Sequence, residues 1–254
     1  MNDVRAWYDD RAAQFRDTVT VEAMFLRLPL DQQRRLTDFK LWLLTHGNEV
    51  SLRDATVLEF GAGHGRLAVE LPVYTSYVGV DLSPRLVEIG NERLARAGLA
   101  ARAHLVASDC LAFDGPRDAF DVVCSLGMFP YVRDPEQVLR KMTSHLKPGG
   151  RLFLDVRYSS PLYDPIRRLR WRLGMGTRAA NPLFSRARLQ TLFAAVGLAD
   201  LRIVMREYPV LGALFMRQGW EWPLTLRNRL ATHPALDWMG TECFVFGTKP
   251  RRPA

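Results

Sequence analysis

Short apolar runs that alternate with helix-like stretches occupy the middle of this sequence. Each run is rich in Val, Leu or Phe, and a stretch with helical spacing separates it from the next. The five runs are TVLEF at 56–60, SYVGV at 76–80, AHLVA at 103–107, FDVVCSL at 120–126 and RLFLDV at 151–156. Strands joined by helices form parallel βαβ units whose helices cover both faces of a sheet. We therefore expect a doubly wound α/β fold.

Two later runs extend the expected sheet. LADLRIVM at 198–205 follows a helix that ends at Gly197, and ECFVFGT at 242–248 is the last run. The helices carry their own start signals, because Ser, Thr, Asp and Asn side chains cap free backbone N–H groups. The expected caps are Ser83, Asp134 and Ser185. With the five earlier runs, the sequence predicts seven strands.

Charge and cysteine content narrow the class of protein. The net charge is +8, and no stretch without Asp, Glu, Lys or Arg exceeds 11 residues, which is too short to span a membrane. The first residues mix acids and bases and show no signal-peptide pattern, so we expect a cytoplasmic protein. Cys110, Cys124 and Cys243 have no metal-ligand spacing. We expect free thiols and no metal.

Positive charge is concentrated in one part of the chain. Residues 151–190 hold nine Arg against two Asp, a net charge of +7. If IRRLRWRLGM is helical, Ile166, Leu169 and Leu173 lie near one side, with Arg168 and Arg172 on another. This pattern is compatible with peripheral contact of residues 166–173 with an anionic membrane. A solvated helix face is the simpler alternative.

The strongest local motif is VLEFGAGHGRLAVEL at 57–71. Glycines at 61, 63 and 65 follow a buried strand and precede a helix. Glycine lets backbone N–H groups approach a ligand closely, and a helix N-terminus favours a carboxylate or phosphate. A dinucleotide fingerprint would need glycine where Arg66 stands. The motif therefore predicts an anion-binding turn other than a dinucleotide site.

Acidic residues follow successive predicted strands. Glu59 lies near the end of the first strand, Asp81 closes the second, and Asp109 follows the third. Ligands bind at this edge of open α/β sheets. S-adenosyl-L-methionine suits three carboxylates because it carries an ammonium, a sulfonium, a ribose diol and an adenine amine. Its own carboxylate suits the glycine turn.

With these residues, the sequence resembles the class I S-adenosylmethionine-dependent methyltransferases, closely over about 55–156 and more loosely to the end. The family pattern E/D-x-G-x-G-x-G is matched by Glu59, Gly61, Gly63 and Gly65. DAFDVVCSLGMFPYV resembles the family's fourth strand, and LKPGGRLFLDV the turn into its fifth. The resemblance implies a Rossmann-like, mostly parallel, seven-stranded sheet with an antiparallel last strand.

The resemblance also implies cofactor-binding residues. The glycine loop would surround the methionine part, Asp81 would bind the ribose, and Asp109 would accept from the adenine amine. S-adenosyl-L-homocysteine would be the product. The implied cofactor-binding residues are Glu59, Phe60, Gly61, Ala62, Gly63, Asp81, Leu82, Ser108, Asp109, Cys110, Ser125 and Leu126.

Two tyrosines are the candidate catalytic residues. Tyr8, in WYDDRAAQF, resembles the family's N-terminal tyrosine, which folds over cofactor and acceptor. Tyr131 stands near the place where many small-molecule members have a His general base. Further candidate bases are His64, expected to pack in the glycine loop, His145, expected on the surface, and His233 and Glu221. A base is needed only for an acceptor that is protonated at neutral pH.

The chain is expected to form one domain with additions. These are a helical cap over 1–50, a cofactor-binding half over 51–158, and a remainder over 159–254 with acceptor-binding inserts at 159–184 and 207–240. We expect methyl transfer to O or N of a small, partly apolar molecule. Three alternatives stay open: a membrane-associated lipid or quinone-like acceptor, RNA, and cofactor binding without catalysis. Nucleic acid is disfavoured because LGMFPY lacks the Asn and double proline of nucleic-acid N-methyltransferases.

Overall fold

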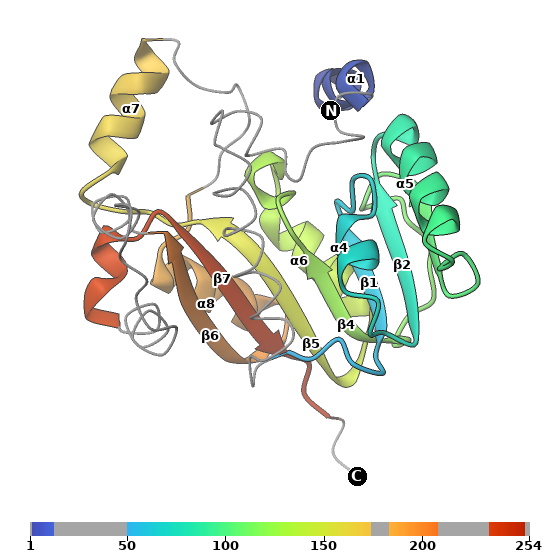
Figure 1. Ribbon diagram of the computed structural model, residues 1–254. Helices are drawn as coiled ribbons and strands as arrows, with labels where there is room; N and C mark the ends of the chain where they lie inside the picture. The colour runs from blue at the N-terminus through green and yellow to red at the C-terminus, as the bar shows by residue number, and fades with distance from the viewer. Residues whose placement is uncertain (1, 13–49, 174–182, 208–233, 252–254) are drawn as a thin grey trace, which may run out of the picture.

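The computed structural model of the chain describes residues 2–12, 50–173, 183–207 and 234–251, and the structural statements below concern these residues. They form a mixed sheet of seven strands with helices on both faces (Figure 1). The strands are β1 (Thr56–Phe60), β2 (Ser76–Asp81), β3 (Ala103–Ala107), β4 (Phe120–Ser125), β5 (Leu146–Arg157), β6 (Ala199–Glu207) and β7 (Glu242–Thr248).

The strand order is β3-β2-β1-β4-β5-β7-β6. Strands β1 to β5 pair in parallel, and β7 is antiparallel to both of its neighbours, β5 and β6. This confirms the expected doubly wound, Rossmann-like sheet with an antiparallel last strand. The order reverses between β1 and β4, which is the switch point where such sheets bind ligands.

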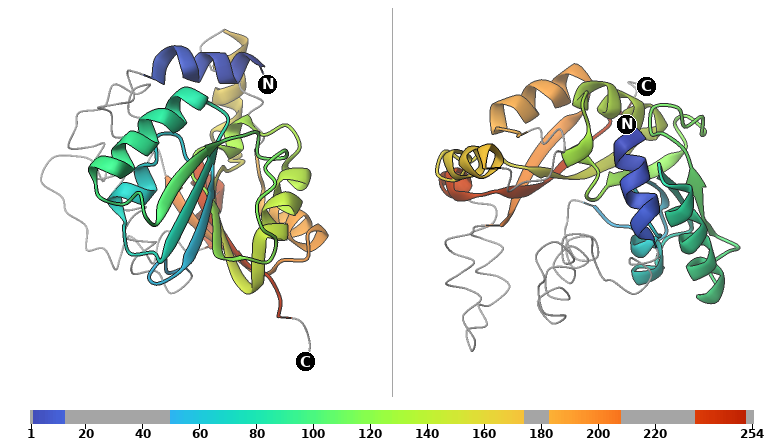
Figure 2. Two further views of the ribbon diagram at one scale, coloured as in Figure 1. Left: turned by 90° about the vertical axis from the view of Figure 1, so that its right-hand side faces the viewer. Right: turned by 90° about the horizontal axis from the view of Figure 1, so that it is seen from above.

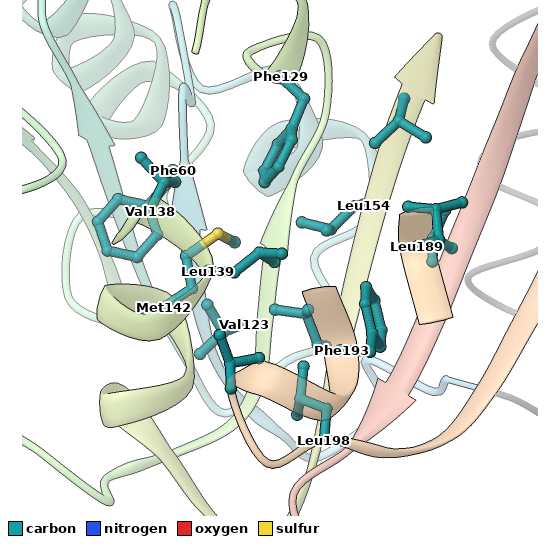
Figure 3. Packing of buried hydrophobic residues seen from close by; sticks show 14 of the residues in the cluster. Phe60, Val123, Phe129, Val138, Leu139, Met142, Leu154, Leu189, Phe193 and Leu198 are labelled. Atoms are coloured by element: carbon teal, nitrogen blue, oxygen red, sulfur yellow. The ribbon is translucent and has the colours of Figure 1, made fainter. Parts of the chain in front are cut away.

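Alternate residues of each central strand point to opposite faces, and each face has its own core. Val57 packs with residues of α4 (Arg66–Glu70) and α5 (Pro84–Arg96). Leu58 packs with residues of α6 (Pro135–His145) and α8 (Arg186–Ala195), and Figure 3 shows this second core between sheet and helices. Figure 2 shows the helices flanking the sheet on its two sides.

Four shorter or peripheral elements complete the described chain. They are α1 (Asn2–Arg11), η2 (Phe129–Tyr131), α7 (Asp164–Arg172) and η3 (Pro234–Met239). No helix among the described residues is long and apolar enough to cross a membrane. Residues 13–49 of the expected helical cap lie outside the described residues, and the division into cap, half and inserts stays a prediction.

The expected helix caps form as hydrogen bonds. Ser83 Oγ accepts from Leu86 N at 3.2 Å, Asp134 Oδ1 from Gln137 N at 3.0 Å, and Ser185 Oγ from Arg188 N at 3.2 Å. The three predicted caps are therefore confirmed.

The fifth strand differs from its predicted bounds. The expected turn at LKPGG belongs to β5, which begins at Leu146, directly after α6. Gly149 has a φ of 83°, and the pairing with β4 shifts register between Phe120 and Val122. A glycine conformation that other residues rarely adopt lets the strand bend here instead of ending.

Leu105 of β3 fills a space that three glycines leave open. A Cβ built on Gly79 would lie 2.2 Å from Leu105 Cδ2, and one on Gly90 would lie 2.0 Å from Cδ1. A Cβ on Gly65 would also approach Cδ1, at 3.2 Å. Both methyl groups of Leu105 are thus confined, so the side chain cannot turn away from an added methyl group.

We predict that Gly90→Ala destabilises the fold although Gly90 lies within α5. Alanine gains about 1 kcal/mol of helix propensity over glycine, but overpacking against Leu105 costs about 1–3 kcal/mol. The expected net effect is a loss of up to about 2 kcal/mol in the free energy of unfolding, measured by urea denaturation. In a Leu105→Ala background the same substitution should cost less, because the His64 backbone, 3.0 Å from the added Cβ, then remains the main obstacle. An equal loss in both backgrounds would show that Leu105 is not the obstacle.

One carboxylate is buried between the first two strands. Glu59 is 4% exposed, and its Oε2 accepts a hydrogen bond from the Tyr77 hydroxyl of β2. Burial raises the pKa of Glu59 to about 7, although the Tyr77 hydrogen bond and the Arg66 charge act in the opposite direction. Glu59 therefore changes its charge near neutral pH in the folded chain.

This pKa predicts a pH-dependent contribution to stability. A raised pKa means that the folded state holds the proton more tightly, so this contribution is full below about pH 4.5 and is lost as the pH rises to about 7. Glu59→Gln stays neutral and can still accept from Tyr77. The free energy of unfolding of Glu59→Gln, compared with that of the unsubstituted protein, should therefore be about 2–3 kcal/mol higher at pH 8 than at pH 5. Urea denaturation at the two pH values measures this difference. The exposed control Glu88→Gln should show no such change, and a flat difference for Glu59→Gln would contradict the raised pKa.

Candidate active site

The glycine loop connects β1 to α4 through three glycines with positive φ. Gly61, Gly63 and Gly65 have φ values of 76°, 55° and 72°. The N–H groups of Gly61 and Ala62 donate to Val80 O at 2.8 and 3.1 Å, which ties the loop to β2. A Cβ on Gly63 would meet no atom within 4 Å, so the loop faces open space there. Because α4 has only five residues, its dipole is weaker than the expected helix would provide.

Asp81 joins the glycine loop to the end of β2. Its Oδ2 accepts from Gly63 N at 2.8 Å, and its Oδ1 accepts from Ser83 N at 2.9 Å. Burial raises the pKa of Asp81, and the two backbone hydrogen bonds lower it in part. Each carboxylate oxygen has a second lone pair, so Asp81 can still accept from two ligand hydroxyl groups.

Asp109 lies beside Asp81, after β3. Ser108 N donates to the Asp81 backbone carbonyl at 2.9 Å, which connects the two strand ends. Asp109 Oδ1 accepts from Leu111 N at 2.8 Å. Burial raises the pKa of the neighbouring Cys110 thiol to about 11, so it stays protonated at neutral pH. The acids at 81 and 109 thus share one edge of the sheet, as the sequence predicts.

The loop after β4 lies directly on the glycine loop. A Cβ on Gly61 would come within 2.6 Å of Met128 Cβ. Gly127 N donates to Asp155 Oδ1 of β5 at 2.5 Å, which anchors this loop. Ser125 is fully buried, and its Oγ has no hydrogen-bond partner among the described residues. The predicted residues after β1 and β4 therefore meet at the switch point of the sheet.

Tyr8 and Tyr131 come together from distant parts of the sequence. Their rings form an edge-to-face pair with centroids 6.0 Å apart and an interplanar angle of 81°. Tyr8 belongs to α1 and packs on Leu86 and Ile89 of α5, while Tyr131 ends η2. The structure thus places both candidate catalytic residues in one cluster near the ends of β2 and β4.

Asp9, which no sequence pattern singled out, attaches α1 at this edge. Asp9 Oδ1 accepts a hydrogen bond from the Ser83 hydroxyl, and its charge raises the pKa of Asp81. Ser83 therefore connects Asp81 to α1, because its N–H donates to Asp81 while its hydroxyl donates to Asp9. The only available signal was the acid pair in WYDDR, which gives no indication of its long-range partner.

Of the further candidate bases, the two that the structure describes are buried. The expectation that His145 is on the surface is wrong: it is 1% exposed, and its ring lies against Phe60, Phe113 and Phe120. Burial lowers its pKa. The Phe60 ring belongs to the same core, so only the backbone of Phe60 can face a ligand. His64 is buried in the glycine loop, as expected. His233 and Glu221 lie outside the described residues.

The three cysteines are free thiols, as the sequence predicts. Cys124 and Cys243 are buried and Cys110 is partly buried. Among the described residues, no group of three or more His, Cys, Asp or Glu could hold a metal ion.

These residues fit the chemistry of S-adenosyl-L-methionine. The open space at Gly63 allows a ligand to approach the backbone closely. The carboxylates of Asp81 and Asp109 retain acceptor capacity. The buried Ser125 hydroxyl offers an unused polar group beside the loop.

Comparisons with known proteins also point to a methyltransferase. A family model described as "Methyltransferase domain" matches residues 28–203, more than half of the chain. A ubiquinone/menaquinone biosynthesis C-methyltransferase from Vibrio vulnificus is 30% identical over 114 residues, covering 43% of this chain and 44% of that protein. A ubiquinone biosynthesis O-methyltransferase from Xanthomonas euvesicatoria is 32% identical over 113 residues, covering 44% and 47%. The chain thus spans less than half the length of these relatives.

A solved structure shows the same fold. It is a geranyl diphosphate C-methyltransferase from Streptomyces coelicolor, in complex with Mg²⁺, geranyl diphosphate and S-adenosyl-L-homocysteine. Its TM-score is 0.62 at 17% identity, over 88% of this chain and 82% of that one. This chain belongs to the methyltransferase-domain family, and its fold is that of the class I S-adenosylmethionine-dependent methyltransferases.

Proposed function

We propose that this protein transfers a methyl group from S-adenosyl-L-methionine to O or N of a small, partly apolar molecule. The observation that carries the proposal is the position of Asp81. Its carboxylate holds the glycine loop and the turn after β2 together, and Ser83 links it to the helix that carries Tyr8. In this arrangement the acid proposed to bind the cofactor would lie close to a pair of aromatic residues that can face an acceptor.

The cofactor would be held by residues from four strand ends. The glycine loop would take its carboxylate, Asp81 the ribose, and Asp109 the adenine amine, with Leu82 against the adenine. When bound, S-adenosyl-L-methionine supplies a methyl group on a sulfonium, which is ready for in-line displacement. Ser125 and Leu126 would lie under the methionine part, and Glu59 would contribute through its buried carboxylate behind the loop.

The chain's own residues would act mainly by alignment. Tyr8 and Tyr131 form an aromatic pair that can exclude water and position an apolar acceptor. Holding two reactants in line can contribute about 7–11 kcal/mol to lowering a barrier. The Glu59 carboxylate accepts a hydrogen bond from Tyr77 inside the sheet. A phenol or alcohol acceptor would therefore depend on the hydroxyl groups of Tyr8 and Tyr131 for any proton transfer.

The acceptor class is supported by the relatives and by the additions to the fold. The names of the matched relatives concern quinone biosynthesis at carbon and oxygen, and the solved structure holds a prenyl diphosphate. We infer that the acceptor is selected by the parts outside the cofactor half. These parts are the cap over 1–50 and the inserts at 159–184 and 207–240. A lipid or quinone-like acceptor at a membrane is the second candidate, favoured by the exposed apolar side chains of α7.

Loss of the Asp81 carboxylate should abolish tight cofactor binding. We expect Asp81→Ala to weaken binding of S-adenosyl-L-methionine at least 100-fold in titration calorimetry, because two charge-assisted hydrogen bonds are lost. Asp81→Asn keeps the shape and should show an intermediate loss. The exposed Asp114→Ala is the matched control, and circular dichroism checks the fold. Unchanged affinity in a folded Asp81 variant would overturn the assignment of this site.

The acceptor class can be measured directly. The protein is incubated with a cell extract and methyl-labelled S-adenosyl-L-methionine, and the label is separated into organic-soluble, small aqueous, nucleic-acid and protein fractions. We expect label in the organic or small aqueous fraction, and none with Asp81→Ala. Label in RNA would replace the small-molecule proposal. Absence of label despite measured cofactor binding would favour a protein that binds without turnover.

A further inference from the structure

The helix α7 is unusual because its apolar side faces away from the protein. Ile166 and Leu169 of α7 are 53% and 57% exposed, and Leu173, whose N–H donates to Leu169 O directly after the helix, is 63% exposed. At 100° per residue these three positions fall within about 60° of one another, so they form a single stripe. In a typical surface helix such a stripe faces the core.

The opposite side of α7 is attached to the protein by polar contacts. Arg167 donates from Nη1 to Tyr158 O at 2.8 Å and from Nη2 to Thr241 O at 2.9 Å. Arg167 also pairs with Asp164 at 3.1 Å, and Asp164 accepts from Ser159 Oγ at 2.7 Å. These contacts fix the rotation of α7 about its own axis. They therefore keep the apolar stripe on the outer side of the helix.

More apolar surface lies beside the start of the helix. Leu162, directly before α7, is 40% exposed, and Trp238 of η3 is 50% exposed. Ser160 Oγ donates to Trp238 O at 2.7 Å, which brings η3 next to the segment that leads into α7. Figure 1 shows η3, drawn in red, below the start of α7 at the same outer end of the molecule.

The charge of this surface favours an anionic partner. The sequence of α7, DPIRRLRWR, has four Arg and one Asp. Arg168 and Arg172 are exposed, whereas the single acid is turned inward and paired with Arg167. Helices that lie in the headgroup region of anionic bilayers combine exposed Leu and Ile with exposed Arg.

We propose that α7, with Leu162 and Trp238, is a docking surface for an anionic lipid bilayer. The apolar stripe of Ile166, Leu169 and Leu173 enters the headgroup boundary, and Arg168 and Arg172 contact lipid phosphates. Since α7 follows the C-terminal end of β5, docking would present the edge of the sheet that carries Asp81 and Tyr131 near the membrane. The contact goes beyond the proposed methyl transfer and does not require it.

Vesicle flotation of the full chain tests this proposal. We expect the protein to float with vesicles of equal parts phosphatidylcholine and phosphatidylglycerol, more weakly with phosphatidylcholine alone, and less as salt screens the charges. The double variant Arg168→Gln and Arg172→Gln should lower the partition coefficient about 30-fold, since each Arg contributes about fivefold. Leu169→Glu with Leu173→Glu should abolish flotation.

A matched control removes the same charge elsewhere. Arg96 ends α5 and Arg117 precedes β4, so both lie at the opposite edge of the sheet. Arg96→Gln with Arg117→Gln should change the partition coefficient less than threefold. An equal loss in both double variants would mean nonspecific attraction of a basic protein, and would overturn the assignment to α7.

Two other outcomes would also overturn the proposal. One is no flotation of the unsubstituted protein with anionic vesicles. The other is self-association through the same stripe, seen as a dimer in light scattering that Leu169→Glu with Leu173→Glu dissociates while vesicles do not bind. Cofactor affinity, measured by calorimetry, should be the same in all α7 variants, so failure of the docking proposal is distinguishable from failure of the proposed methyl transfer.

Discussion

The carboxylate of Asp81 connects the segments on which the rest of the site depends. It accepts from the backbone of the glycine loop on one side and from the start of α5 on the other. Through Ser83 the same network reaches Asp9 of α1. A buried carboxylate is costly unless several donors satisfy it, so the surrounding backbone must keep its conformation. One side chain at the end of β2 therefore connects three segments around the proposed cofactor region.

Close packing behind the loop supports this arrangement. Leu105 occupies the space left by glycines at 65, 79 and 90, so β2, β3, α5 and the glycine loop approach each other closely. On the other side, Met128 lies against Gly61 and Asp155 anchors the loop after β4. The glycines thus serve two purposes: positive φ in the loop, and room for neighbouring side chains in the strand and helix.

Two regions of the molecule have an unusual distribution of buried and exposed side chains. At the switch point, polar groups such as Glu59 and Ser125 are buried beside the proposed cofactor region. At α7, apolar groups are exposed beside arginines. Both are departures from the usual distribution of polar and apolar residues, and both lie where we propose that a partner from outside the chain binds.

Local signals were sufficient for most of the regular structure. Short apolar runs predicted the strands. Ser83, Asp134 and Ser185 predicted helix starts, because a cap acts only on its own first turn. The bounds of β5 were harder, since Gly149 could either end a strand or bend it. The placement of His145 was wrong because a His near the end of a helix carries no local sign of the aromatic rings that cover it.

The sequence by itself determined the order of the elements, the glycine turn and the acids that follow the strands. These follow from residue types within a few positions of one another. Only the tertiary structure decided that Tyr8 meets Tyr131, that Asp9 reaches Ser83, and that the apolar side of α7 faces outward. Contacts between residues far apart in the chain depend on how complete elements pack, and that information is not present in any short segment.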